Sequence, residues 1–158
     1  MYNHISILKS LLGKAHQHSS DKEKPVGAFI LFPDGSSAFG CNKTRHGEEL
    51  SKDKANIVHA EISALSEVSH GKEKGIMYVT KTPCVGCANA IIGSGKVDVL
   101  VTPKPYLESR WYDKQVEALE YLQESLTVIL VDFDDRNFKE DLIDKSPRSL
   151  LHSLGILV

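Results

Sequence analysis

The chain has 158 residues, 41% of them hydrophobic and 25% charged, which matches one soluble globular domain with a buried core. It contains no apolar run near the roughly 20 residues that cross a bilayer and its start lacks the pattern of a secretory signal, so we expect a single cytoplasmic domain, residues 1–158, without membrane association. A formal net charge of −2 argues against a sequence-independent polynucleotide binder, which usually carries a positive face.

The first third of the chain is predicted to form a helix and a β-hairpin. Apolar residues recur at helical spacing over Ile5–Leu12. An apolar run at Val26–Phe32 precedes the turn Pro33-Asp34-Gly35, and Ser37–Cys41 can return as a second strand. The charged stretch Asn42–Asn56 is predicted to be a surface loop.

The rest of the chain alternates between helix and strand patterns. The predicted elements are a helix marked by Val58, Ile62, Leu65 and Val68, a strand at Met77–Thr80, a helix at Pro83–Ile92 ended by Gly93 and Gly95, a strand at Val97–Thr102, a helix marked by Tyr112, Val116, Leu119 and Leu122, a strand at Thr127–Phe133, and a last apolar segment at Leu150–Leu157. A hairpin followed by alternating strands and helices indicates an α/β fold, with helices packed on a mixed sheet.

The cysteines point to a metal rather than to a disulfide framework. Their number is three, which is odd and low for a chain without a secretion signal. Cys84 and Cys87 are three residues apart, so both can face one side of a helical turn. With Thr82 as N-cap and Pro83 at the first helical position, they would lie at a helix N-terminus, where thiolate is favoured. Cys41 lies in a predicted strand and is interpreted as a small buried hydrophobe.

His59, at the start of the preceding predicted helix, can complete a metal site with Cys84 and Cys87. One imidazole and two thiolates suit tetrahedral zinc, and three protein ligands leave a fourth position for chemistry. Zinc can lower the pKa of a water molecule to about 7. Glu61 follows His59 by two residues, so it can stand beside the metal and carry the water's proton to a ring nitrogen and then to a leaving amine.

Each motif taken alone also fits a less specific role. A lone Cys-x-x-Cys is a structural zinc half-site or a redox pair about half the time, and a non-enzymatic zinc scaffold needs no carboxylate at Glu61. His-x-Glu followed by Pro-Cys-x-x-Cys is, however, the combined signature of zinc deaminases. The combination therefore favours an enzyme.

From Val26 to Val131 the sequence resembles the cytidine deaminase superfamily, and within it the deoxycytidylate (dCMP) deaminases. The resemblance rests on VGAFILFPDGSSAFGCN, VHAEISAL and MYVTKTPCVGCANAIIGSGKVDVLV. It implies a three-layer α/β/α fold with a five-stranded mixed sheet, a Zn²⁺ cofactor, and hydrolysis of a cytosine nucleotide, dCMP, to dUMP and ammonia. It also implies a homo-oligomer, for which the apolar end Leu150–Val158 is a candidate contact.

The resemblance implies substrate contacts as well. Asn42 matches the residue that binds the sugar hydroxyl, the backbone N–H of Ala60 should contact the pyrimidine carbonyl, and Tyr106 falls near the aromatic beside the base. A turn Asn and an ordinarily packed Tyr are the alternatives. The candidate phosphate ligands, each of which is otherwise a solvated surface charge, are Lys43, Arg45, Lys104 and Arg110.

Other branches of the superfamily fit less well. Free-cytidine deaminases generally have Cys where His59 stands. Transfer-RNA adenosine deaminases share both motifs but typically have an Asp- and Lys-containing, Gly-rich segment where this chain has Thr102–Tyr106. Polynucleotide cytidine deaminases usually carry more basic and aromatic residues around the site. The segment after Asn42, KTRHGEELSKDK, lacks the Gly-rich loop of regulated dCMP deaminases, so allosteric control by nucleoside triphosphates is not expected.

Overall fold

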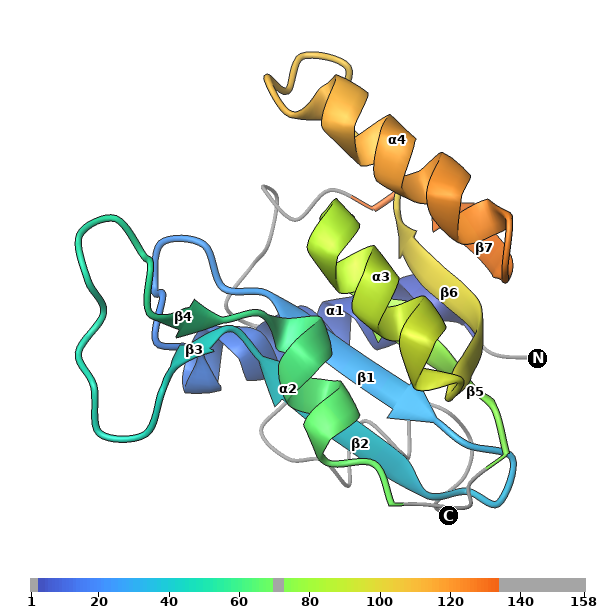
Figure 1. Cartoon of the computed structure of the whole chain (residues 1–158), viewed down its shortest axis with the longest axis horizontal. Coiled ribbons are helices and arrows are strands. Elements are labelled where there is room, and N and C mark those ends of the chain that lie inside the picture. Colours follow the sequence, from blue (N-terminus) through green and yellow to red (C-terminus); the bar gives the residue numbers. More distant parts are fainter. Residues whose placement is uncertain (1–2, 70–72, 134–158) are drawn as a thin grey trace.

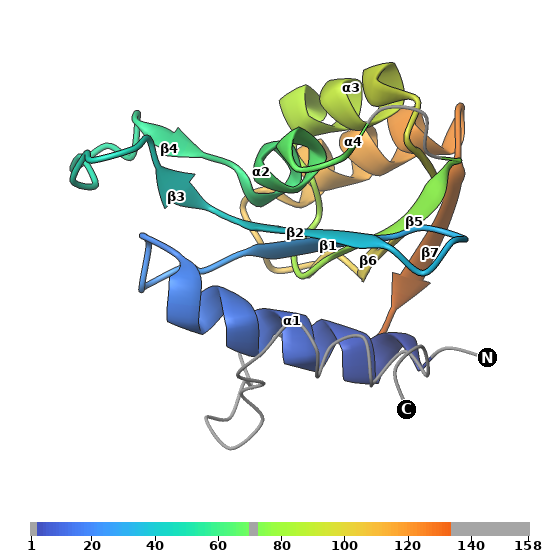
Figure 2. The same ribbon diagram turned by 90° about the horizontal axis from the view of Figure 1, so that it is seen from below.

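A computed structural model describes residues 3–69 and 73–133 of the chain. The protein is a three-layer α/β/α sandwich. Helix α1 (His4–His18) covers one face of the sheet. Helices α2 (Ala60–Ser66), α3 (Val85–Ser94) and α4 (Tyr112–Gln123) cover the other face, as Figures 1 and 2 show. The predicted fold class is confirmed. The apolar segment predicted at Leu150–Leu157 lies outside the described residues.

The central sheet is mixed and has five strands in the order β2-β1-β5-β6-β7. The strands are β1 (Gly27–Leu31), β2 (Ser37–Cys41), β5 (Gly75–Val79), β6 (Val97–Pro103) and β7 (Thr127–Val131). Strand β1 runs antiparallel to β2 and β5, whereas β5, β6 and β7 are parallel to one another. The carboxyl ends of β2 and of the parallel strands therefore meet at one edge of the sheet, where the start of β1 also lies.

A short two-stranded ribbon lies beyond this edge, where the sequence predicted only a loop. Strands β3 (Lys43–Thr44) and β4 (Ile57–Val58) pair antiparallel and lead from β2 into α2 (Figure 2). Val58 thus belongs to a strand, because it pairs with Lys43, although its apolar spacing suited a helix. Helix α2 is correspondingly shorter than predicted.

Two apolar clusters fill the spaces between the layers. Strand β1 is buried along its whole length and supplies both clusters, because successive side chains point to opposite faces. Ala28 and Ile30 face the cluster beneath α2, α3 and α4, whereas Phe29 and Leu31 face the α1 cluster. Helix α1 closes its own cluster with the apolar residues that predicted it, among them Ile7, Leu8, Leu11 and Leu12.

Gly40 allows α2 to lie directly against β2. A Cβ atom at this position would come within 2.6 Å of the carbonyl oxygen of Ala60, and nearer still to the backbone nitrogen of Ala64. Both atoms are backbone, so no rotation of a side chain could make room. The absence of a side chain at Gly40 therefore fixes the height of α2 above the sheet.

Candidate metal centre and adjoining cavities

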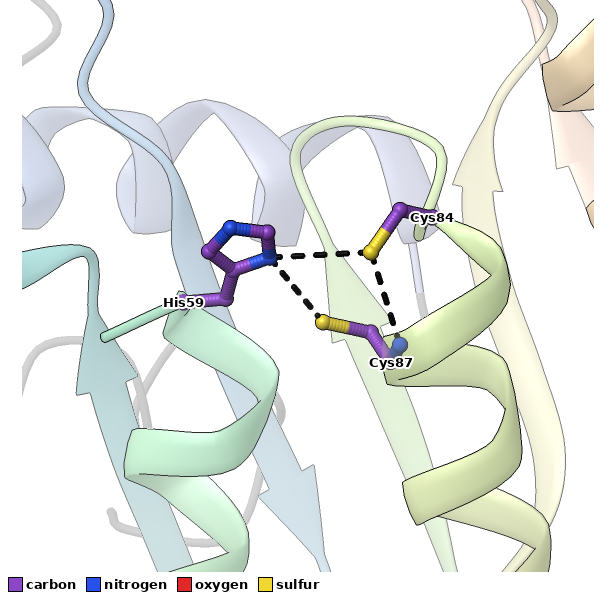
Figure 3. Close-up of side chains that lie close together, drawn as sticks. All are labelled: His59, Cys84 and Cys87. Carbon is purple, nitrogen blue, oxygen red and sulfur yellow. Dashed lines mark hydrogen bonds between the residues drawn. The ribbon is translucent and has the colours of Figure 1, made fainter. Parts of the chain in front are cut away.

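His59, Cys84 and Cys87 come together where α2 and α3 begin side by side (Figure 3). His59 is the N-cap of α2, Cys84 is the N-cap of α3, and Cys87 lies in the first turn of α3. The Nδ1 atom of His59 lies 3.2 Å from the Sγ of Cys87 and 3.7 Å from the Sγ of Cys84. The ligand atoms of all three residues lie within 4.8 Å of one another.

The cap of α3 differs from the prediction. Thr82 and Pro83 precede the helix, and Cys84 caps it with extended backbone angles, φ −74° and ψ 169°. Its Sγ accepts a hydrogen bond from the Cys87 backbone N–H over 3.4 Å. The thiol of Cys84 therefore does what the hydroxyl of Thr82 was predicted to do, and the helix N-terminus lies directly at the sulfur.

These three residues fit a zinc ion. Tetrahedral bonds of about 2.3 Å to sulfur and 2.1 Å to nitrogen place the nitrogen and sulfur ligands about 3.6 Å apart, and the two observed distances lie on either side of that value. Burial, with the nearby Glu61 carboxylate and Cys84, raises the pKa of the Cys87 thiol. A cation among these groups would offset that crowding of negative charge, as zinc does when it binds thiolates.

Glu61 lies on the first turn of α2, and its side chain is only 4% exposed. Burial raises the pKa of its carboxyl group, while His59 and a hydrogen bond with Cys87 act in the opposite direction. Both His59 and Glu61 line a cavity of about 390 Å³, here called the zinc cavity. That volume lies within the range of small-molecule sites. A carboxyl group therefore faces the same space as the metal ligands.

The family model for the zinc-binding region of cytidine and deoxycytidylate deaminases matches residues 1–102. The chain belongs to this deaminase family. The matched region holds His59, Cys84, Cys87 and Glu61, and the resemblance found in the sequence is confirmed. No curated protein sequence matches the chain.

Solved deaminases share the fold at low sequence identity. The dCMP deaminase of cyanophage S-TIM5, solved in complex with dCMP and dUMP, has a TM-score of 0.60 and 24% identity, over 76% of this chain and 93% of that one. Its apo form has a TM-score of 0.59 and 23% identity, over 79% and 97%. A structure from a study of A-to-I editing by tRNA:A34 deaminases has a TM-score of 0.51 and 18% identity, over 89% and 99%.

Asn42 and Ala60, the two residues expected to contact sugar and base, both line the zinc cavity. Three hydrogen bonds to the protein hold the Asn42 side chain. Its Oδ1 accepts from the Val26 N–H at 2.8 Å and from the Ser19 Oγ at 2.5 Å. Its Nδ2 donates to the Lys24 carbonyl at 2.9 Å. Ala60 is the first residue of α2. First-turn N–H groups have no carbonyl partner within their helix, which suits the predicted contact with a pyrimidine carbonyl.

The aromatic side chain at the zinc cavity is Trp111, which the sequence analysis overlooked. Tyr106 instead lines a neighbouring cavity of about 740 Å³, here called the annex cavity. Trp111 is 50% exposed and lines both cavities. The available signal in the sequence was a single tryptophan directly after Arg110, but no motif marks it.

The predicted phosphate ligands divide between two places. Lys104 and Arg110 line the annex cavity. Lys43 and Arg45 belong to the ribbon and the turn after it, and they lie outside the described lining of both cavities. The cations on the zinc cavity are ones that the sequence analysis did not select, namely Lys24, Lys54 and Lys81.

Lys54, between β3 and β4, forms an ion pair with Asp21 in the lining of the zinc cavity. Its Nζ lies 2.8 Å from the Oδ2 of Asp21, whose side chain is 5% exposed. Burial alone would raise the pKa of Asp21, but hydrogen bonds from Lys54 and from backbone N–H groups bring it below its ordinary value. Lys54 adopts a left-handed backbone with φ 59°, which is unfavourable for a residue with a side chain. The ion pair therefore holds a strained residue at the edge of the site.

Among residues 3–69 and 73–133, no helix is both long enough and apolar enough to cross a membrane.

Proposed function

We propose that this protein is a zinc-dependent hydrolase that deaminates a cytosine nucleotide, with dCMP converted to dUMP and ammonia. The observation that carries the proposal is the group of one imidazole and two thiols within 4.8 Å of one another, with the buried Glu61 facing the same cavity. The S-TIM5 dCMP deaminase, solved with dCMP and dUMP, shares the fold and supports this choice of substrate.

Each residue of the site has a distinct task in this reaction. Zinc held by His59, Cys84 and Cys87 would lower the pKa of water towards neutrality. Glu61 takes one proton from the attacking water and delivers it to the ring nitrogen N3. It then takes the second proton, from the hydroxyl added at C4, and delivers it to the amino group, which leaves as ammonia. Glu61 lines the same cavity as His59, which supports this role.

The walls of the zinc cavity position the base. The N–H of Ala60 donates to the pyrimidine carbonyl, and the indole of Trp111 covers the ring. Asn42 offers its second amide hydrogen to the sugar, and its three hydrogen bonds to the protein keep that group fixed. Holding the base in one orientation contributes to the rate by removing the entropy cost of alignment.

The test is to measure ammonia release by zinc-loaded Glu61→Gln protein. We expect turnover of dCMP to fall by about 10²–10⁴-fold, while the zinc content stays at the wild-type level, because Glu61 is not a ligand. Glu67→Gln is the matched control, since it makes the same change at the exposed C-cap of the same helix and should retain full activity. Normal turnover by Glu61→Gln, or no turnover of any cytosine monomer by the zinc-loaded wild type, would contradict the proposal.

A single domain over residues 1–158, a cytoplasmic location and a homo-oligomeric assembly stay predictions from the sequence and the resemblance. Sedimentation of the purified protein would measure the oligomeric state directly.

A further inference from the structure

The annex cavity gathers positive charge although the whole chain has a formal net charge of −2. Its described lining includes four side chains that are cationic at neutral pH, together with one carboxylate, Glu23, and the imidazole of His16. The four cations are Lys24, Lys81, Lys104 and Arg110. They come from the loop before β1, the loop after β5 and the segment between β6 and α4, so distant parts of the chain converge on one space.

The annex cavity and the zinc cavity share part of their walls. Lys24, Lys81, Thr82 and Trp111 line both. The zinc cavity alone, at about 390 Å³, already has the volume of a small-ligand site, and the annex cavity, at about 740 Å³, has nearly twice that volume. A nucleotide with its base beside Glu61 therefore has a second, basic cavity next to it.

One of the annex cations has a side-chain contact that positions it, and another has a fixed backbone. The guanidinium of Arg110 lies 4.8 Å from the ring centre of Trp111, within the range of a cation–π contact. The backbone N–H of Lys104 donates to the Val131 carbonyl over 2.9 Å, which places the backbone of this residue, though not its side chain, beside the end of β7. Side chains that are already positioned lose less entropy when they bind a ligand.

Gln115 adds a polar group without a partner. Its side-chain oxygen is buried and has no hydrogen-bond partner, and the residue lines the annex cavity. Rotation of the carboxamide would turn its NH₂ group towards the cavity, where it could donate to an anionic oxygen. Gln115 can thus present a hydrogen-bond donor to an anion in the cavity.

We infer that the annex cavity receives a polyphosphate, so that the protein deaminates cytosine nucleoside triphosphates more efficiently than the monophosphate. This inference rests on the proposed function. Several cations around one cavity match a ligand that concentrates its negative charge, whereas a polynucleotide spreads its charges and requires cations along a surface track. Lys24 and Lys81, on the shared wall, would contact the phosphate nearest the sugar, and Lys104 and Arg110 the phosphates beyond it.

The kinetic test compares deoxycytidine, dCMP, dCDP, dCTP and a dinucleotide with cytosine at its 3′ end, using the zinc-loaded full chain. We expect kcat/KM to rise at least tenfold from dCMP to dCTP, mainly through a lower KM. Lys104→Ala and Arg110→Ala should each reduce the ratio of kcat/KM for dCTP to that for dCMP about tenfold. Lys9→Ala, which removes the same charge from an exposed position of α1, should leave the ratio unchanged.

A binding measurement tests the inference independently of turnover. Trp111 is the single tryptophan of the chain and lines both cavities, so its fluorescence can report ligand binding to the zinc-loaded Glu61→Gln variant. Tighter binding of dCTP than of dCMP is expected. Equal or weaker binding overturns the inference even where no compound is turned over.

The outcomes separate the two proposals. Turnover of dCMP without any gain from added phosphates overturns the polyphosphate inference and leaves the proposed function in place. Faster turnover of the dinucleotide than of dCTP overturns it in favour of a nucleic-acid substrate. Absence of turnover with every cytosine compound contradicts the proposed function, and the fluorescence titration then decides what the annex cavity binds.

Discussion

Replacing Gly40 with Ala should push α2 away from β2 and so displace His59, the N-cap of α2, from the other metal ligands. The new Cβ would lie 2.6 Å from the Ala60 carbonyl oxygen, whereas ordinary contacts begin at 3.4 Å. Because the obstructing atoms belong to the backbone, α2 as a whole must move by at least about 0.8 Å, the difference between these two distances, and the still nearer nitrogen of Ala64 requires more. His59 and Glu61 move with it, whereas Cys84 and Cys87 are carried by α3.

The size of the effect follows from that displacement. Overpacking of this kind costs about 1–3 kcal/mol of stability, and the opposing gain from a stiffer unfolded chain is only about 0.4–1 kcal/mol. A shift near 1 Å at a catalytic group can reduce the rate about 10²-fold. Zinc binding should weaken as well, since bond lengths at a zinc site tolerate only about 0.2 Å.

The assay combines thermal unfolding, zinc content and ammonia release for Gly40→Ala, with Gly93→Ala as the control. Gly93 lies within α3, and a Cβ there would have nothing within 4 Å, so this variant should be slightly more stable than the wild type. If Gly40→Ala unfolded at the wild-type temperature, bound zinc normally and kept its activity, α2 would not lie as close to β2 as described.

Acid and thiol chemistry provide two more tests. Because the pKa of Asp21 in the folded state lies below the ordinary value of 3.8, its ion pair with Lys54 stabilises the fold above that pH and loses this contribution as the pH falls through the lower folded value. Asp21→Asn should therefore be less stable than wild type at pH 6, and this difference should shrink as the pH falls below 3.8. A difference that stays the same at every pH in denaturant titrations would refute this. In metal-free native protein a thiol reagent should modify the exposed Cys84 before the buried Cys41, because burial also raises the pKa of the Cys41 thiol. Mass spectrometry should show that zinc protects Cys84. Equally fast modification of Cys41 would show that its strand opens.

Local signals in the sequence predicted much of the fold. The apolar period of α1 and the turn Pro33-Asp34-Gly35 depend on neighbours along the chain, and both elements occur where expected. The order of the two motifs also indicated that His59 and the two thiols would meet, because each motif begins a helix at the same edge of the sheet. These inferences needed only spacing and chain order.

Predictions that depended on contacts between distant segments were less accurate. Val58 pairs with Lys43 across the ribbon, and the periodicity of a single segment contains no information about such a partner. Trp111 rather than Tyr106 reaches the zinc cavity, because the path of the segment between β6 and α4 decides which aromatic side chain faces inward. The lining by Lys24 and Lys54 likewise arises from loops that meet only in the folded chain.

The division of the core into two clusters has a consequence for how this chain can diverge. The described cluster around Ile7, Leu11 and Phe29 lies on the α1 face of the sheet, while the metal ligands begin the helices of the other face. Volume-conserving exchanges among apolar residues cost little stability, so the α1 face can accumulate them while the zinc geometry stays intact. The two sides of one sheet are thus free to change at different rates, one restrained by packing alone and the other also by chemistry.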